Sequence, residues 1–236
     1  MNRIASVGGQ IPLALSIKEK PGFDLFVVGD NSETCHSIKS IAKGIKQSSC
    51  YLWGQSGCGV SHLLQAACML ADDHKRKVSY IPLKDHAALD PEVLENLDSM
   101  DVVCIDDIDS IAGELDWEQP LLHLYNRLRE KGCVMLIGAH TGPKALGFQL
   151  QDLKSRMVWD LVYHLKLLDD YSKIDVLRLR ANARAFELPR EVAEYLVKRV
   201  RRDLPGLIKL LDQFEEATLI EKRKLTVPFV KELLSE

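Results

Sequence analysis

The sequence alternates short, almost continuously apolar runs with longer segments whose apolar residues recur at helical spacing. The apolar runs occupy residues 50–54, 78–83, 101–107, 133–139 and 161–167. Such runs are typical of strands that are buried on both faces of a parallel sheet. The segments between them, for example 62–75 and 115–131, have the three- and four-residue spacing of amphipathic helices. This alternation predicts an α/β domain with a parallel sheet and right-handed crossovers.

The pattern changes after Leu168, where strand-like runs stop and helical spacing continues. Four helices are expected: one around residues 177–183, one with Pro189 in its first position, one from about Leu204 to Lys222, and one after an N-cap at Thr226. We therefore predict a small all-helical domain over 169–236 and an α/β domain over 21–168. Residues 1–20 contain glycine and lack helical spacing, so we expect them to form a flexible tail.

Composition excludes several broad classes of protein. The 236 residues are 46% hydrophobic and 28% charged, with a net charge of −3, so nothing favours a general coat for nucleic acid. No run is apolar enough to span a bilayer, and the N-terminal segment lacks the features of a signal peptide. The six cysteines have no zinc-ligand spacing. We expect a cytoplasmic protein that does not associate with membranes.

A glycine-rich loop follows the first apolar run and reads GQSGCGVSH over residues 54–62. It matches the pattern G-x-x-x-x-G-K-[ST] except at Val60, which replaces the lysine. Backbone N–H groups in such a loop bind phosphates at a helix N-terminus, whereas the lysine contacts the β- and γ-phosphates. The predicted nucleotide-binding residues here are Gly54, Ser56, Gly57, Cys58, Gly59, Val60, Ser61 and His62. Valine leaves the backbone groups in place but removes the charge, so ADP or another nucleoside diphosphate should be favoured over a triphosphate, with poor hydrolysis.

The run at 101–107 ends in Asp106 and Asp107, and carboxylates at such a strand end hold Mg²⁺ and orient water in nucleotide-hydrolysing folds. Asp106 is therefore predicted to contact the nucleotide, and Asp106 and Ser61 would be the ligands if a Mg²⁺ ion is present. Either motif alone also fits a loop that binds nothing. Together, in this order, they favour nucleotide binding.

Several motifs resemble those of the bacterial initiator DnaA family. They are FDLFVVGDN (23–31), YLWGQSGCGVSHLLQA (51–66), VVCIDDID (102–109), LYNRLREKG (124–132), DLKSRM (152–157) and FELPREVAEYLVKRV (186–200). The resemblance implies an AAA+ P-loop fold with a five-stranded parallel sheet and a helical lid. It also implies that Phe26, Val27, Val28 and Asn31 approach the base and ribose, although Phe26 and Val28 suit a core equally well.

The resemblance is stronger to short members of the family that switch DnaA off after initiation, because no DNA-binding domain follows the lid before Glu236. In those members a tail peptide docks on the β sliding clamp. The segment QIPLAL carries the corresponding residues Gln10, Ile11, Leu13 and Leu15. An extended peptide of this kind inserts alternate apolar side chains into a preformed pocket. A tail that packs on its own domain is the simpler alternative.

The motif DLKSRM places an arginine finger at Arg156, which the resemblance assigns to the ATP site of a neighbouring molecule. An arginine that senses the γ-phosphate in the lid is replaced by Pro205, and Arg201 and Arg202 lie too far upstream to be assumed equivalent. His140 occupies the place of a polar sensor residue. The chain is thus expected to have an impaired ATPase of its own.

The resemblance implies a regulatory adaptor that binds the DNA-loaded clamp, contacts DNA only through it, and stimulates ATP hydrolysis by DnaA, which prevents re-initiation. An autonomous ATPase of the loader type is the alternative, and Val60 and Pro205 argue against it. A DNA-binding relative of the initiator is a third hypothesis, without a visible recognition helix. Pairing with a second copy of the chain stays open.

Overall fold

Five parallel strands form the sheet of the computed structural model, which describes residues 21–200 and 203–234. The strands are β1 (Cys50–Trp53), β2 (Val78–Pro82), β3 (Val102–Asp106), β4 (Val134–Ala139) and β5 (Leu161–His164). Their order is β2-β3-β4-β1-β5, and every pairing is parallel. All five predicted strands are confirmed, as is the parallel sheet.

Burial differs between the inner and the edge strands. Every residue of β3 and β4 is buried, whereas β5 alternates half-buried and exposed positions. The prediction that all five strands are buried on both faces is therefore wrong for both edge strands, β2, in which only Ile81 is buried, and β5. An edge strand has a hydrogen-bonded neighbour on one side only, so Val162 and His164 remain exposed to solvent.

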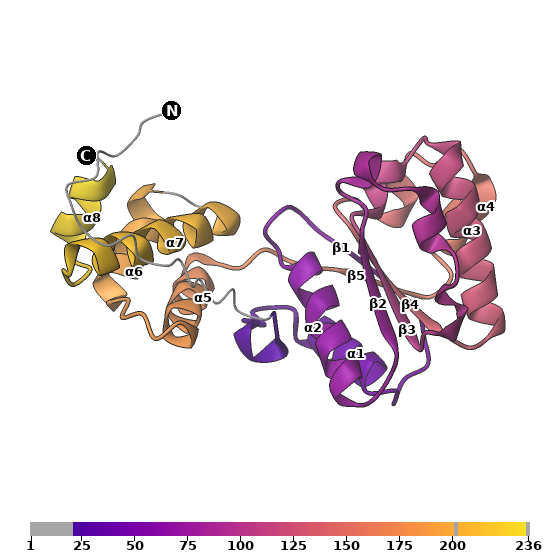
Figure 1. Ribbon diagram of the computed structural model, residues 1–236, viewed down its shortest axis with the longest axis horizontal. Coiled ribbons are helices and arrows are strands. Elements are labelled where there is room, and N and C mark those ends of the chain that lie inside the picture. The colour runs from indigo at the N-terminus through magenta and orange to yellow at the C-terminus, as the bar shows by residue number, and fades with distance from the viewer. Residues whose placement is uncertain (1–20, 201–202, 235–236) are drawn as a thin grey trace.

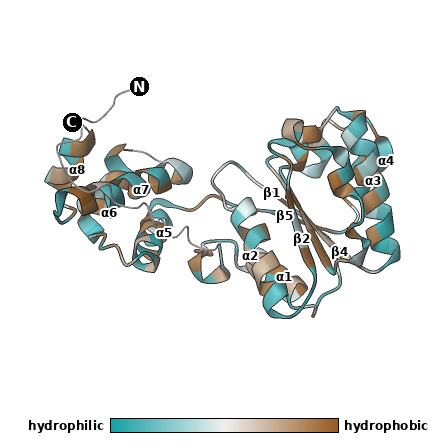
Figure 2. Ribbon diagram, viewed as in Figure 1, coloured by the Kyte–Doolittle hydropathy of each residue, from teal (hydrophilic) through white to brown (hydrophobic). Residues whose placement is uncertain are grey.

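Helices cover both faces of the sheet (Figure 1). One face packs against α1 (Ser32–Ala42) and α2 (Val60–Asp73), and the other against α3 (Leu115–Glu130) and the short α4 (Gln151–Arg156). Successive strand residues point to opposite faces. Leu52 accordingly joins the core under α2, whereas its neighbour Tyr51 joins the core under α3. The apolar strands between the amphipathic helices stand out in brown (Figure 2).

A second body of helices follows β5 and has its own apolar core. It comprises α5 (Asp170–Ala183), α6 (Arg190–Tyr195) with a π turn over Leu196–Val200, α7 (Leu204–Glu221) and α8 (Val227–Leu234). Asp169 and Asp203 accept backbone N–H groups at the starts of α5 and α7, as N-cap residues do. Thr226 caps α8 as predicted, whereas Pro189 is the N-cap of α6 rather than its first residue.

Short 3₁₀ helices complete the described chain at Phe23–Leu25, His86–Ala88, Pro91–Leu94, Leu97–Ser99, Ile108–Ile111 and Pro143–Ala145. Among residues 21–200 and 203–234, no helix has the length and apolar character needed to cross a membrane.

Candidate functional site

The glycine-rich loop connects the end of β1 to the start of α2, as a phosphate-binding loop does. Gly57 and Gly59 have φ angles of +86° and +101°, in the left-handed region that glycine tolerates. A Cβ atom at Gly54 would lie 2.6 Å from the carbonyl oxygen of Leu165, so only glycine fits there. The first backbone N–H groups of α2 have no intrahelical acceptor, so they can bind an anion, and Ser56 and Ser61 are exposed beside them.

Val60 is buried where the loop enters α2. Both Val60 and Asp106 lie close to Gly138. The position that a Cβ atom would take at Gly138 is 2.8 Å from Val60 Cγ1 and 2.5 Å from Asp106 Oδ1. The valine side chain therefore packs into the core beside the strand-end carboxylate, and it offers no positive charge to a phosphate.

The segment before α1 lies against this loop. The Phe26 ring comes within 2.9 Å of the position of a Cβ atom at Gly59, and its centroid is 5.6 Å from that of His62. Val27 and Val28 are half-buried. Asn31 is buried, and its side-chain amide both donates to and accepts from the backbone of Lys166, at 3.1 and 2.8 Å. The Asn31 side chain thus links this segment to the chain after β5, and its backbone N–H and carbonyl bond to Val28 and Cys35.

His62 connects three parts of the molecule. Its Nε2 atom is 2.9 Å from the carbonyl oxygen of Gly22, and its Nδ1 atom is 3.2 Å from Arg180 Nη2 in α5. Because a carbonyl only accepts, Nε2 carries the proton and Nδ1 accepts from the guanidinium. The sequence predicts a nucleotide contact for His62, and the structure shows both of its ring nitrogens engaged with Gly22 and Arg180. Sequence reasoning missed Arg180 because nothing near this arginine in the chain indicates its partner.

A pocket of about 230 Å³ lies between the loop and the helical body. Its lining residues are Ser56, Gly57, Leu167, Leu168, Lys173, Asp203 and Leu204. Pro205 closes one side, since its Cδ atom would be 2.9 Å from a Cβ atom at Gly57. Lys173, which is paired with Asp170 at 3.0 Å, is a cation at this pocket that sequence reasoning missed.

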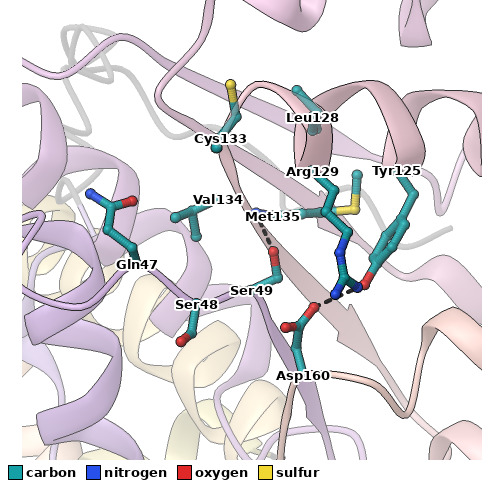
Figure 3. Close-up of a pocket in the computed structure, with 11 residues that line it drawn as sticks. Gln47, Ser48, Ser49, Tyr125, Leu128, Arg129, Cys133, Val134, Met135 and Asp160 are labelled. Atoms are coloured by element: carbon teal, nitrogen blue, oxygen red, sulfur yellow. Dashed lines mark hydrogen bonds between the residues drawn. The ribbon is translucent and has the colours of Figure 1, made fainter.

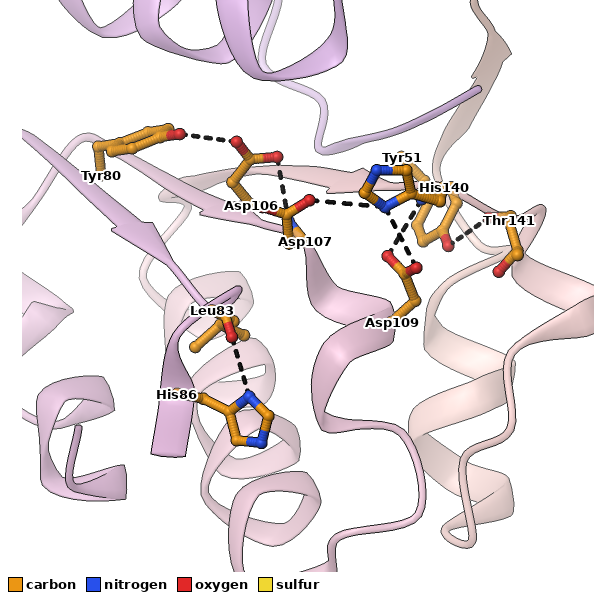
Figure 4. Close-up of polar contacts among 9 residues, drawn as sticks. All are labelled: Tyr51, Tyr80, Leu83, His86, Asp106, Asp107, Asp109, His140 and Thr141. Atoms are coloured by element: carbon orange, nitrogen blue, oxygen red, sulfur yellow. Dashed lines mark hydrogen bonds and ion pairs between the residues drawn. The ribbon is translucent and has the colours of Figure 1, made fainter. Parts of the chain in front are cut away.

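Asp106 lies at the end of β3 and is buried (Figure 4). Its Oδ2 atom accepts a hydrogen bond of 2.6 Å from the Tyr80 hydroxyl, and its Oδ1 atom accepts the backbone N–H of Asp107 at 3.0 Å. Burial is the main cause, and the hydrogen bond to Asp106 the second, that raises the pKa of Tyr80, so the hydroxyl remains a donor. Each carboxylate oxygen retains a second lone pair beside its hydrogen bond, so these bonds do not exclude coordination of Mg²⁺ by Asp106. No group of three or more potential metal ligands occurs in the described part of the chain.

His140 follows the end of β4 and faces two carboxylates (Figure 4). Its Nδ1 atom is 3.5 Å from Asp107 Oδ1 and 3.3 Å from Asp109 Oδ2, and its backbone N–H donates to Asp109 at 3.0 Å. Burial and the neighbouring Asp106 carboxylate raise the pKa of Asp107. The strand ends thus bring the expected sensor residue next to the acidic cluster.

Arg156 is the last residue of α4, on the face of the sheet opposite to α2 (Figure 1). Its guanidinium carbon lies 3.8 Å from the ring centroid of Trp159. The Nε atom is buried and makes no hydrogen bond within the described residues. The side chain is half-buried overall. Arg156 therefore lies across the sheet from the loop that leads into α2 of the same chain.

Some predicted residues lie outside the described part of the chain. They are Gln10, Ile11, Leu13 and Leu15 of the expected clamp peptide, together with Arg201 and Arg202.

Two family models match the chain in succession. Residues 17–164 match the bacterial DnaA ATPase domain, and residues 169–234 match the lid domain of Hda. The chain belongs to the bacterial DnaA family. The DnaA match spans the sheet and its helices, and the Hda match spans α5–α8. The chain is therefore a DnaA-related AAA+ protein of replication initiation.

Solved structures agree with this fold. Domain III of the replication initiation protein DnaA from Thermotoga maritima superposes with a TM-score of 0.80 at 24% identity, covering 92% of this chain and 96% of that one. DnaA from Aquifex aeolicus bound to AMPPCP has a TM-score of 0.67 at 24% identity, covering 82% and 65%. The Thermotoga maritima RuvB branch migration motor has a TM-score of 0.65 at 17% identity, covering 90% and 72%. The predicted AAA+ fold with a helical lid is confirmed.

Proposed function

We propose that this DnaA-family protein is a regulatory adaptor that stimulates ATP hydrolysis by DnaA. Arg156 would enter the ATP site of a neighbouring DnaA molecule, where a guanidinium stabilises charge on the transferring phosphoryl group. The position of Arg156 supports this role, because the sheet separates α4 from the α2 face where the chain's own loop continues. The finger is therefore suited to another molecule's nucleotide.

The chain's own nucleotide would be ADP or another diphosphate, retained between the loop and the lid. The backbone N–H groups around Gly57 and Gly59 would bind it, and Lys173 would face it from α5. Neither Val60 nor Pro205 offers a charge to a γ-phosphate. The pocket of about 230 Å³ is smaller than typical ligand clefts of about 300–1,000 Å³, so the lid would have to open slightly to admit the ligand. A Mg²⁺ ion would be held by Ser61 and Asp106.

The tail supplies the second proposed contact, because Gln10, Ile11, Leu13 and Leu15 would dock on the β sliding clamp. The clamp encircles DNA, so the adaptor would meet DNA only indirectly while it meets DnaA. Stimulated hydrolysis would then take place in the cytoplasm and only where a clamp has been loaded on DNA. Loss of ATP-bound DnaA would thereby prevent re-initiation.

The test is ATP hydrolysis by DnaA in the presence of clamp loaded on DNA, with wild-type chain, Arg156→Ala or Lys154→Ala. Lys154→Ala is the matched control, because it removes a cation two residues away in the same helix. Fingers supplied in trans are worth about 10³–10⁵ in rate, so Arg156→Ala should abolish the stimulation and Lys154→Ala should keep it. Full stimulation by Arg156→Ala would refute the proposal.

The loader-type alternative makes a different prediction for the isolated chain. It requires steady ATP turnover without DnaA, and this turnover should be lost in Asp106→Asn. Our proposal expects negligible turnover by the isolated chain.

A further inference from the structure

One face of α3 contacts both ends of α4. Near the start of α3, Glu118 accepts the backbone N–H of Leu150, the N-cap residue of α4. Seven residues later, the Tyr125 hydroxyl donates to Asp160 Oδ2 at 2.8 Å, just beyond the turn that follows α4 (Figure 3). Residues seven apart lie on one face of a helix. Helix α3 thus holds the chain immediately before α4, at Leu150, and shortly after it, at Asp160.

Trp159 lies in the turn between these two anchors. Its backbone N–H donates to the carbonyl oxygen of Arg156 at 3.2 Å, which continues the helical turn beyond α4. The ring centroid is 3.8 Å from the guanidinium carbon of Arg156 and 4.7 Å from that of Arg129 in α3. Its neighbour Asp160 is held by Tyr125, so the ring is supported from both its own turn and α3.

The guanidinium of Arg156 has few other constraints. Its Nε atom is buried and without a hydrogen bond among the described residues, so the ring contact is what orients the group. The face of an indole attracts a cation electrostatically. The N–H donors of a guanidinium lie in one plane, so a guanidinium held over a ring through its carbon still presents donors at its edge to phosphate oxygens.

We propose that Trp159 is a positioning residue that fixes the Arg156 guanidinium in the orientation required for action on a partner's nucleotide. The inference rests on the proposed function, in which Arg156 is the finger. Trp159 is 51% exposed, so a direct contact with DnaA is the competing role for the same ring. The two roles differ kinetically, because positioning affects the maximal rate whereas a surface contact affects the concentration needed to reach it.

The experiment titrates wild-type chain, Trp159→Ala, Trp159→Phe and Arg156→Ala into the clamp-dependent DnaA ATPase assay. A cation–π contact of this kind corresponds to roughly a 3- to 30-fold change in rate. Trp159→Ala should lower the maximal stimulated rate by that factor with an unchanged half-saturating concentration. Trp159→Phe, which keeps an aromatic face, should restore most of the rate.

A second measurement uses the isolated protein and is independent of DnaA. The Nε–H signal of Arg156 in a ¹H–¹⁵N spectrum, assigned with Arg156→Lys, should experience the ring current of Trp159 and should move in Trp159→Ala and Trp159→Phe. If Trp159→Ala does not fold, Trp159→Leu replaces it in both measurements, because leucine fills the site without an aromatic face and should lower the maximal rate in the same way. A signal insensitive to both substitutions would overturn the inference.

The outcomes separate this inference from the proposed function. Wild-type stimulation by Arg156→Ala would remove the proposed function itself. Loss of stimulation in Arg156→Ala with a wild-type maximal rate in Trp159→Ala would overturn only the positioning role. An increased half-saturating concentration alone, or a faster rate in Trp159→Ala, would also overturn it, because the ring would then be a contact surface or a restraint.

Discussion

Replacing Glu118 with glutamine is expected to destabilise the protein by about 2–4 kcal/mol. Glu118 is completely buried near the start of α3. Its carboxylate accepts three backbone N–H groups, from Gly113 at 2.8 Å, Gln149 at 3.0 Å and Leu150 at 2.8 Å. Because α4 has no side-chain cap from its own N-cap residue, Glu118 supplies the missing acceptor from another helix.

The magnitude follows from these three bonds. If the glutamine oxygen replaces Oε1, its NH₂ group faces the N–H of Leu150, and two donors then oppose each other. An unsatisfied buried donor costs about 1–3 kcal/mol. The bonds to Gly113 and Gln149 lose their charge assistance, which weakens each by roughly half. Removal of a buried negative charge offsets part of this loss.

The assay is urea unfolding followed by circular dichroism, with Glu130→Gln as the control. Glu130 ends the same helix but is exposed, so its substitution should change the free energy of unfolding by less than about 0.5 kcal/mol. For a chain of this size, the expected loss in Glu118→Gln corresponds to a Tm lower by roughly 4–16 °C. If Glu118→Gln were as stable as Glu130→Gln, the three backbone contacts would not be what holds α4 in place.

Two further predictions concern the loop and the cysteines. Calorimetry should show that wild-type protein binds ADP at least as tightly as ATP, and that Val60→Lys shifts the preference toward ATP by about 10-fold or more, because a charged hydrogen bond to phosphate contributes about 1.5–3 kcal/mol. An unchanged preference would contradict our interpretation of the loop. In the native protein, maleimide should label the partly exposed Cys133 first, since burial raises the pKa of Cys50 to about 12 and leaves little thiolate. Equal labelling rates for these two thiols would contradict the structure.

The strands and the lid helices could be predicted because their signals are local. Continuous apolar runs mark the inner strands, and Thr226 precedes α8 as an N-cap should. The burial of β5 was predicted wrongly, although His164 and Lys166 interrupt its apolar run and were an available signal. Apolar content alone does not distinguish an edge strand from an inner one, because strand order depends on the crossovers.

The contacts between distant side chains could not be predicted in this way. Tyr80 donates to Asp106, and Arg180 meets His62, yet neither residue lies near its partner in the sequence. Asn31 shows the same limit, since its amide binds the backbone of Lys166, 135 residues away. Tertiary packing decides these pairs, and hydrophobic periodicity contains no information about them.

The loop and the proposed finger, Arg156, depend on different parts of the fold. Val60 packs among side chains of the α2 face, close to Asp106 and Gly138. Arg156 depends instead on α3, through Glu118 at one end of α4 and the turn containing Trp159 at the other. Val60 and Arg156 share none of these contacts. The separation across the sheet is therefore compatible with the proposed function, in which the loop has no charge for a γ-phosphate while Arg156 acts on a neighbouring molecule.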